Sequence, residues 1–516
     1  MRGCEASLVE VHERVKVVNR SGILKVREAP CILWGVVQDN VFFYNNSMSV
    51  VLRALRERLY LVRGRDGFVP CPKPTASFTQ LKWITRRIRR LLPCFPPVWT
   101  NEEFVQSYTG SKRARYEAAV ANLARRGLRR QDGYLKTFIK AELYNGTSKG
   151  NPCPRLIQPR SAEYNVRLGV YIRPLEKATY KAIDRLYRHH VVLKCDNMVQ
   201  RAETICEYWS EFRKPRFVGL DASRFDQHVS EQALEFEHDY YKSVHHDPEL
   251  EKLLSWQVKQ VGYANMVDGT VKYTVDGCRA SGDMNTALGN VLLMCTMAYS
   301  YLSELPCKWR FINDGDDCGI FIDEEDLHHL DGIPSHFLKF GFEMEVEKPV
   351  SVLELVEFCQ CKPVQLNAEK WMMVRNAHKA MKHDWISLTS RNYSHHDENL
   401  HATGICGLAM YADVPVLGAM YAAMVRLPCR DKVLKRILED ERSGLGRTWR
   451  MFSSTMRDFP IDETIARVSF YNAFGILPDE QIALESHFRA FDCKIKLTKT
   501  PIFSGPENSV QYFQDG

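Results

Sequence analysis

The sequence predicts an α+β fold in which an antiparallel sheet packs against helices. Three stretches lead to this prediction: a tight hairpin at residues 311–321, a strand that runs into a helix at residues 216–236, and a helix without charged residues at residues 284–303. A chain of 516 residues with 45% hydrophobic content can bury a large core and form several subdomains.

Residues 311–321 are typical of a hairpin because two apolar, β-prone runs flank an acidic Asp-Gly turn. Asp316 and Asp317 are adjacent at its tip, so their carboxylates repel each other. A divalent cation would relieve this repulsion. Taken alone, a solvated Asp-Gly hairpin explains the stretch equally well.

A second acidic position follows the apolar residues 216–220, which are typical of a short buried strand that ends at Asp221. If this strand lies beside the hairpin, Asp221 and Asp316 can hold two Mg²⁺ ions about 3.5–4 Å apart. Mg²⁺ prefers oxygen ligands and takes further oxygens from substrate phosphates. By itself, Asp221 could equally be a helix N-cap.

Between the two acidic positions, Ser281 and Gly282 form a flexible turn that leads into a helix. Thr286 and Asn290 are four residues apart and therefore share one face of that helix. We expect Asn290 to point at a ligand or at Asp226.

Residues 284–303 include no charged residue, and the stretch is long enough for a membrane-spanning helix. Polar residues interrupt the stretch, and a helix buried beneath a sheet explains it better. These polar residues are Asn285, Thr286, Asn290, Thr296 and Ser300.

The order of these motifs resembles the palm of viral RNA-dependent RNA polymerases, and most closely the replicases of tombusvirus-like plant positive-strand RNA viruses. Each motif alone is weak evidence, but three in order with compatible spacing are specific. They are Asp221-x4-Asp226, Ser281-Gly282-x3-Thr286-x3-Asn290 and Gly315-Asp316-Asp317.

The resemblance implies a right-hand polymerase with fingers, an antiparallel palm flanked by helices, and a mostly helical thumb. Fingers would span residues 96–215 and 230–275, the palm residues 216–229 and 276–390, and the thumb residues 391–516. Residues 1–95 would be an extension that bridges fingers and thumb.

The resemblance also implies RNA-directed RNA synthesis that replicates a viral genome, with de novo initiation favoured. Asp221 and Asp316 would be the primary Mg²⁺ ligands and Asp317 an auxiliary one, with Mn²⁺ as an alternative ion. Asp226 and Asn290 would bind the ribose 2′-hydroxyl. The turn residues Ser281 and Gly282, together with Thr286, would position that network.

Further residues resemble supporting motifs of the family. Lys140, Arg155 and Arg160 would line the nucleotide tunnel and bind the triphosphate. Lys348 would be the general acid that protonates pyrophosphate, or else a surface lysine paired with Glu345 or Glu347.

The thiols of Cys359 and Cys361 are interpreted as structural, because no matching pair at structural-zinc spacing occurs elsewhere in the sequence.

Charge is distributed unevenly along the chain. The net charge is +7, but residues 1–200 hold 36 Lys and Arg against 16 Asp and Glu, whereas the remainder is acidic. A basic front half suits an enzyme that guides an RNA template, nascent RNA and nucleoside triphosphates toward metal ions. Residues 82–90 combine a tryptophan with basic residues, a pattern common on RNA-binding surfaces.

The 16 cysteines without a signal peptide favour free thiols in a reducing cytosol. With no transmembrane segment expected, the resemblance implies host cytoplasm, at membrane-associated replication complexes. A membrane-anchored viral replication protein or a fused segment would supply the anchor, with host factors as further partners. The resemblance is compatible with a chain that is the polymerase part of a readthrough or frameshift product.

Two rival functions differ at named positions. A reverse transcriptase should carry a bulky aromatic residue in place of Asp226 and a tyrosine in place of Gly315. A non-catalytic RNA-binding relic would be free to lose any of four residues that are all present: Asp221, Asp316, Asp317 and Asn290.

The sequence also predicts peripheral elements. Strands are expected near residues 31–37 and 41–44, and helices near residues 49–61, 111–126, 418–425, 432–441 and 463–473. Ser111 is the expected N-cap of the second helix, and Gly127 its stop signal.

Overall fold

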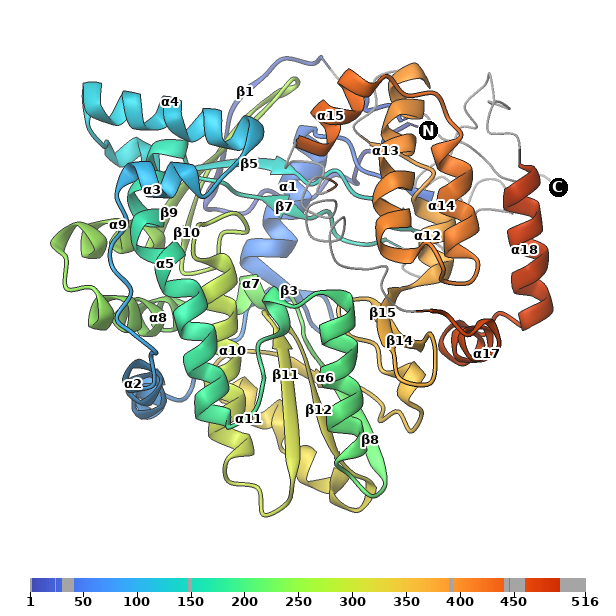
Figure 1. Cartoon of the computed structure of the whole chain (residues 1–516). Helices are drawn as coiled ribbons and strands as arrows, with labels where there is room; N and C mark the ends of the chain where they lie inside the picture. The colour runs from blue at the N-terminus through green and yellow to red at the C-terminus, as the bar shows by residue number, and fades with distance from the viewer. Residues whose placement is uncertain are drawn as a thin grey trace.

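The computed structural model describes residues 2–23, 25–29, 41–146, 151–388, 393–439, 445 and 460–491 (Figure 1). The strand expected near residues 31–37 lies outside the described residues, as does much of the stretch beyond residue 440 that was assigned to the thumb.

A four-stranded antiparallel sheet carries the predicted acidic motifs. Its order is β11 (Trp309–Asp314), β12 (Asp317–Asp323), β8 (Pro215–Ala222) and β13 (Met344–Val346). The predicted hairpin is confirmed, with Asp314 paired to Asp317 and Gly315 at a φ of 95° in the turn. Only glycine adopts that conformation at little cost.

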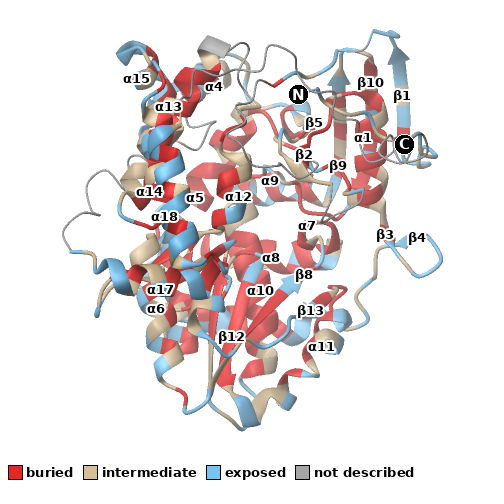
Figure 2. Cartoon of the chain, turned by 90° about the vertical axis from the view of Figure 1, so that its right-hand side faces the viewer, coloured by how far each residue is buried: buried red, intermediate tan, exposed pale blue. Residues whose placement is uncertain are grey.

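Helices cover both faces of this sheet, because alternate strand residues point to opposite sides. Val218, Leu220 and Ile320 face α10 (Thr286–Leu302), α5 (Ala162–Tyr187) and α8 (Glu231–Val244) in the largest core. Their neighbours Phe217 and Phe321 face α6 (Met198–Ser210) in a second core. The sheet is therefore an interior layer, as the red strands and helices in Figure 2 show.

The helix α10 is buried on nearly all sides, which confirms the buried-helix interpretation. Among the described residues, no helix combines the length and the apolar character needed to cross a membrane.

Two glycines lie opposite each other in the middle of the four-stranded sheet. Gly219 of β8 pairs in register with Gly319 of β12. A Cβ atom on Gly319 would overlap the ring of Phe217, and one on Gly219 would overlap the carboxylate of Glu347. The space at Gly319 is therefore closed to a side chain, whereas the space at Gly219 is filled by the end of a flexible one.

A second sheet of five strands has the order β1 (Val15–Arg20), β10 (Gly269–Asp276), β9 (Lys259–Met266), β5 (Leu135–Ile139) and β7 (Leu156–Ile157). Strands β5 and β9 are parallel, and the other neighbours are antiparallel. The helix α1 (Met48–Leu55) packs on it in a third core. The helix predicted at 49–61 is thus shorter, and continues as a π-helical turn at Arg56–Tyr60.

Helices dominate the C-terminal part that the structure describes. They surround a core that contains Trp385, Tyr421 and Phe488. The predicted helices at 418–425, 432–441 and 463–473 are confirmed as α14 (Leu417–Val425), α15 (Asp431–Glu439) and α17 (Glu463–Phe474).

The basic helix predicted at 111–126 is confirmed as α4 (Gly110–Arg126), and Gly127 ends it at a φ of 67°. The predicted N-cap is wrong by two positions, since Thr109 holds that place.

The remaining elements connect these layers. They are β2 (Val41–Phe42), β3 (Leu61–Arg63), β4 (Phe68–Pro70), η2 (Phe78–Leu81), α2 (Lys82–Arg90), α3 (Asn101–Gln106), η3 (Arg130–Gly133), β6 (Tyr144–Asn145), η4 (Leu193–Cys195), α7 (Phe225–His228), α9 (Pro248–Val258), η5 (Glu324–Leu330), α11 (Ile333–Lys339), η6 (Leu353–Leu355), β14 (Cys361–Gln365), β15 (Trp371–Arg375), α12 (Ala377–His383), α13 (Tyr393–Tyr411) and α18 (Pro478–Ala490).

Candidate active site

Three predicted carboxylates meet at one end of the four-stranded sheet. Asp221 lies near the end of β8, directly opposite Asp317 at the start of β12, and Asp316 lies in the adjoining turn. All three residues have surface that solvent reaches, although the surrounding protein excludes water from much of the space around Asp316 and Asp317. Strand pairing therefore brings together the residues that the sequence placed in separate motifs.

The surroundings of these carboxylates make their negative charge costly. Burial raises the pKa of Asp316 to about 6, and the carboxylates of Asp226 and Asp317 add to the shift. Burial also raises the pKa of Asp317, with Asp314 and Asp221 contributing. Such a site gains from a cation, so these residues fit Mg²⁺.

A fourth carboxylate, Glu347, stands beside this group. Its amide donates to the Gly219 carbonyl at 2.9 Å. Burial raises the pKa of Glu347, and Asp221 is the charge that contributes most. The sequence analysis treated Glu347 only as a partner for Lys348, although the pairing of β13 with β8 is what brings it here.

The oxygens of Asp221, Asp316 and Asp317 are not tightly gathered. Among the described residues, the only set of three potential metal ligands with all atoms within 4.8 Å of one another lies elsewhere. Because aspartate side chains rotate about two torsions, rotamer changes alone can bring these oxygens toward a shared cation.

Asp226 accepts two hydrogen bonds in the way expected for the ribose-recognition motif. Asn290 Nδ2 donates to Asp226 Oδ1 at 3.0 Å, and Ser281 Oγ donates to Oδ2. The expectation that Asn290 points at Asp226 is confirmed. Thr286 Oγ1 donates to the Ala280 carbonyl at 3.1 Å, which braces the turn before the helix. Contact of this group with ribose stays a prediction.

A buried ion pair fixes the orientation of Asn290. Arg279 Nε donates to Asn290 Oδ1 at 3.1 Å, so the amide nitrogen must face Asp226. Arg279 also pairs with Glu237, and both side chains are essentially inaccessible to solvent. A Cβ atom on Gly289 would overlap both Arg279 and Glu237, which explains the glycine before Asn290.

Two basic residues that no sequence motif indicates hold the hairpin of β11 and β12. Lys194 Nζ lies 2.8 Å from Asp314 Oδ1, and Arg201 pairs with Oδ2. Although burial alone would raise it, these cations hold the pKa of Asp314 below its usual value. The Cys359 thiol also approaches Asp314 Oδ2, at 3.6 Å. No sequence spacing links these residues, since they come from separate elements.

Lys140 and Arg155 lie together at the edge of the five-stranded sheet. The Lys140 amide donates to the Arg155 carbonyl at 2.9 Å, and both side chains approach Glu142, at 3.2 and 3.5 Å. The neighbouring Gln158 amide donates to the Ser281 carbonyl at 2.9 Å, so this basic segment adjoins the ribose motif. Gly282, at a φ of 136°, allows the close approach.

The prediction that Arg160 binds triphosphate is wrong. Its side chain is fully buried, and its guanidinium bonds Asp283, Gln260 Oε1 and the Gly133 carbonyl. The guanidinium nitrogens of Arg160 donate to groups inside the protein and are not available for a triphosphate. Arg160 therefore stabilises the core beneath the Ser281–Gly282 turn.

Lys348 is exposed and lies two residues after the end of β13. It forms no ion pair with Glu345, Glu347 or any other carboxylate that the structure describes. Its role as a general acid stays a prediction.

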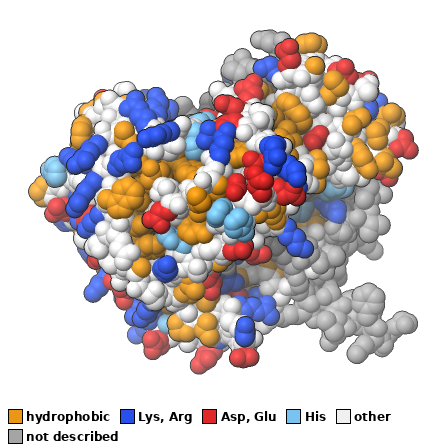
Figure 3. Space-filling view, turned by 90° about the horizontal axis from the view of Figure 1, so that it is seen from below, with side chains coloured by type: hydrophobic (Ala, Val, Ile, Leu, Met, Phe, Trp, Pro, Cys, Tyr) orange, Lys and Arg blue, Asp and Glu red, His pale blue; other side chains and the backbone are white. Residues whose placement is uncertain are grey.

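The predicted RNA-binding cluster at residues 82–90 is the amphipathic helix α2. Ile84 and Ile88 are buried, whereas Trp83 and Arg87 are exposed. In the view of Figure 3, Lys and Arg side chains gather on the left, the side on which α2 lies in Figure 1.

The sequence of most of the chain is similar to those of known viral polymerases. A family model described as viral RNA dependent RNA polymerase matches residues 15–496. The RNA-directed RNA polymerase of Pothos latent virus (isolate Pigeonpea/India) is 40% identical over 448 residues, which are 86% of this chain and 58% of that protein. The enzyme of Tobacco necrosis virus (strain A) is 41% identical over 446 residues, 86% of this chain and 61% of the relative. That of Turnip crinkle virus is 38% identical over 450 residues, 86% and 57% of the two chains.

The chain thus spans about three fifths of the length of these curated relatives. The matches confirm the resemblance inferred from the three motifs.

Proposed function

Since the chain belongs to the family of viral RNA-dependent RNA polymerases, we propose that it forms the catalytic part of an RNA-directed RNA polymerase of a plant positive-strand RNA virus. The reaction is attack by the 3′-hydroxyl of RNA on the α-phosphate of a nucleoside triphosphate, which releases pyrophosphate. The observation that carries this proposal is the convergence of Asp221, Asp316 and Asp317 at one sheet end, next to Asp226.

Asp221, Asp316 and Asp317 would hold Mg²⁺, or Mn²⁺ in its place, and Glu347 is close enough to assist. Bound Mg²⁺ would activate the attacking hydroxyl and neutralise charge on the phosphates. Pairing of β8 with β12 fixes the backbone positions of these ligands, so that binding of the ion would require only side-chain rotation.

The Asp226 group would select ribose. Each carboxylate oxygen already accepts one hydrogen bond and can accept another, so Asp226 can accept a hydrogen bond from the ribose 2′-hydroxyl. The second amide hydrogen of Asn290 can donate to the same hydroxyl. A deoxyribose would leave these polar groups without a partner, which penalises DNA precursors.

Lys140 and Arg155 would bind the incoming triphosphate, because they are cationic, accessible and adjacent to the Ser281 turn. Lys348 would protonate the leaving pyrophosphate.

The four-stranded sheet and its helices correspond to a palm, the five-stranded sheet to fingers, and the C-terminal helices to a thumb. The N-terminal residues suit the role of a bridge. Strand β1 pairs with β10, and Val41 and Phe43 pack against Ile386. We further propose de novo initiation, and action in host cytoplasm at membrane-associated complexes with a membrane-anchored viral replication protein and host factors.

Incorporation of labelled ribonucleotides on a defined RNA template tests the proposal. Wild type should extend RNA, and Asp316→Asn should lose at least about a thousandfold in rate. Glu325→Gln is the matched control, because Glu325 is an exposed carboxylate beyond the other end of β12. Equal activity of wild type and Asp316→Asn would refute the catalytic assignment.

A further inference from the structure

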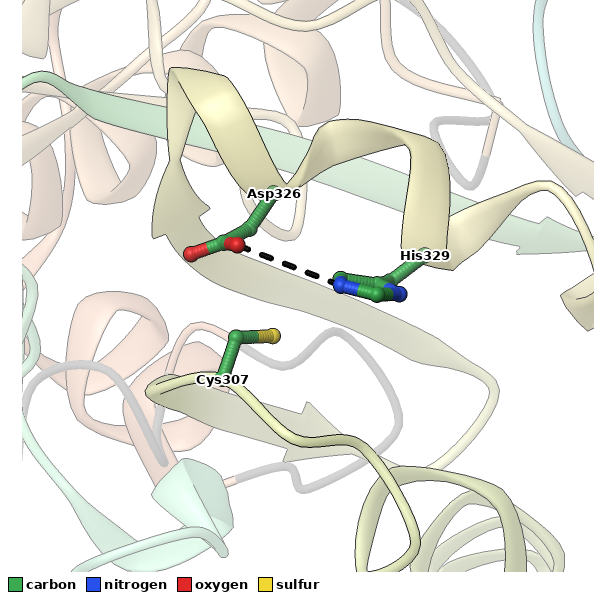
Figure 4. Close-up of side chains that lie close together, drawn as sticks. All are labelled: Cys307, Asp326 and His329. Carbon is green, nitrogen blue, oxygen red and sulfur yellow. Dashed lines mark ion pairs between the residues drawn. The ribbon is translucent and has the colours of Figure 1, made fainter.

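Three side chains of different chemistry converge at the base of the catalytic hairpin, at the opposite end from Asp316. They are Cys307, in the connection between α10 and β11, and Asp326 and His329 on η5, which follows β12. Figure 4 shows the three directed toward one common space. Their ligand atoms all lie within 4.8 Å of one another, and no other set among the described residues meets this condition.

In the part of the chain that the structure describes, these groups have few contacts beyond one another, chiefly the His328 ring, whose centroid lies 4.0 Å from that of His329. His329 Nε2 is 4.0 Å from Asp326 Oδ1, too far for a hydrogen bond. Within the described parts of the chain, no donor reaches the Asp326 carboxylate and no hydrogen bond reaches the His329 ring. Both side chains are only 27% exposed, so solvent access is limited. A surface ion pair would explain why Asp326 and His329 lie close together, but it would not explain why the Cys307 thiol lies beside both of them.

The backbone around the group is held before any ion binds. In a 3₁₀-helix, residues three apart project from the same side, so η5 aligns Asp326 with His329. The Tyr301 hydroxyl donates to the His329 carbonyl at 2.7 Å, which anchors η5 to α10. The ligand directions are therefore set by helix geometry and by packing.

We propose that Cys307, Asp326 and His329 bind a zinc ion that ties together the two open ends of the catalytic hairpin. A thiolate, an imidazole and a carboxylate together favour Zn²⁺ over the hard ions Mg²⁺ and Ca²⁺. Water would complete the tetrahedron. Because Cys307 precedes β11 and the other two ligands follow β12, the ion would close the hairpin at its base.

Zinc binding here would release a proton. An ordinary cysteine thiol has a pKa of about 8.5, so it is mostly protonated at neutral pH and loses its proton when it binds a metal as thiolate. Metal affinity should therefore rise with pH.

The test uses the full chain freed of metal with a chelator and then titrated with Zn²⁺ or Co²⁺. Wild type should bind a single ion, give the near-ultraviolet thiolate-to-cobalt absorption band, and melt at higher temperature with Zn²⁺. Cys307→Ser should lose the band and the melting shift. His329→Gln should weaken affinity more than about 100-fold, since even groups behind the ligands contribute about 10- to 100-fold.

Cys94→Ser and His328→Gln are matched controls, because Cys94 is exposed elsewhere and His328 adjoins His329 outside the set. Both should behave as wild type. Equal zinc affinity in wild type, Cys307→Ser and His329→Gln would overturn the proposal, as would no binding by wild type. If Cys307→Ser does not fold, the zinc affinities of His329→Gln and His328→Gln are compared instead. Equal affinities would overturn the proposal. None of these readouts depends on nucleotide incorporation, so the proposal fails or stands separately from the polymerase activity.

Discussion

Asn290 Nδ2 donates a hydrogen bond to Asp226 Oδ1 at 3.0 Å, and Arg279 on its other side determines which way the amide points. The buried pair of Arg279 and Glu237 thus orients a side chain at the active site. The proposed ribose selectivity would therefore depend on a charge pair in the core.

Substitution of Asp226 by alanine should weaken ribose selection. Without the carboxylate, one acceptor for the 2′-hydroxyl is lost, worth about 1 kcal/mol or roughly fivefold in selectivity. The measurement is the ratio of GTP to dGTP incorporation efficiency. Ser223→Ala, at an exposed neighbouring position, should leave the ratio unchanged. An unchanged ratio in Asp226→Ala would refute the assigned role.

Glu237→Gln should destabilise the protein by about 3–5 kcal/mol, because it leaves the Arg279 charge buried without its counter-ion. Asp239→Asn, on the same helix and in a half-exposed pair with Lys242, should cost about 1 kcal/mol or less. Urea unfolding at neutral pH measures both. If both variants lost a similar amount of unfolding free energy, burial of the Arg279–Glu237 pair would not explain its contribution to stability.

Arg201→Gln and Lys194→Met should lower kcat by about 10- to 100-fold with little change in nucleotide KM. They loosen Asp314 and hence the hairpin that presents Asp316, without removing a group that binds nucleotide. Lys214→Met, at an exposed position near the other end of β12, is the control. A change in KM alone would instead indicate direct substrate contact.

His190 should stabilise the fold in a pH-dependent way. Hydrogen bonds to Asp184 and Asp196, at 2.9 and 2.6 Å, raise the pKa of His190 to about 10. Since the folded-state pKa exceeds the unfolded value of about 6.5, the charge contribution is complete below about pH 6.5 and disappears as the pH rises through 10. The difference in unfolding free energy between wild type and His190→Gln should therefore shrink from pH 6.5 to 10. A difference that does not vary with pH would rule this out.

Local patterns predicted the catalytic hairpin, the strand before Asp221 and the buried helix α10. Each is encoded by a short run whose apolar spacing and turn residues favour one structure. The approach of Asn290 to Asp226 also followed from the motif spacing.

Long-range pairing was not predictable in the same way. The resemblance places Arg160 in the nucleotide tunnel, but the resemblance of a segment does not tell which of its side chains are buried. Lys194, Arg201 and Arg279 were not assigned, because their acidic partners come from elements far away in the sequence.

The facing glycines of the central sheet imply different evolutionary freedom at two neighbouring positions. Alanine at Gly219 would meet only the flexible carboxylate end of Glu347, which can swing aside. Alanine at Gly319 would meet the packed ring of Phe217, which has little room to move. Alanine should therefore be tolerated at position 219 and selected against at position 319.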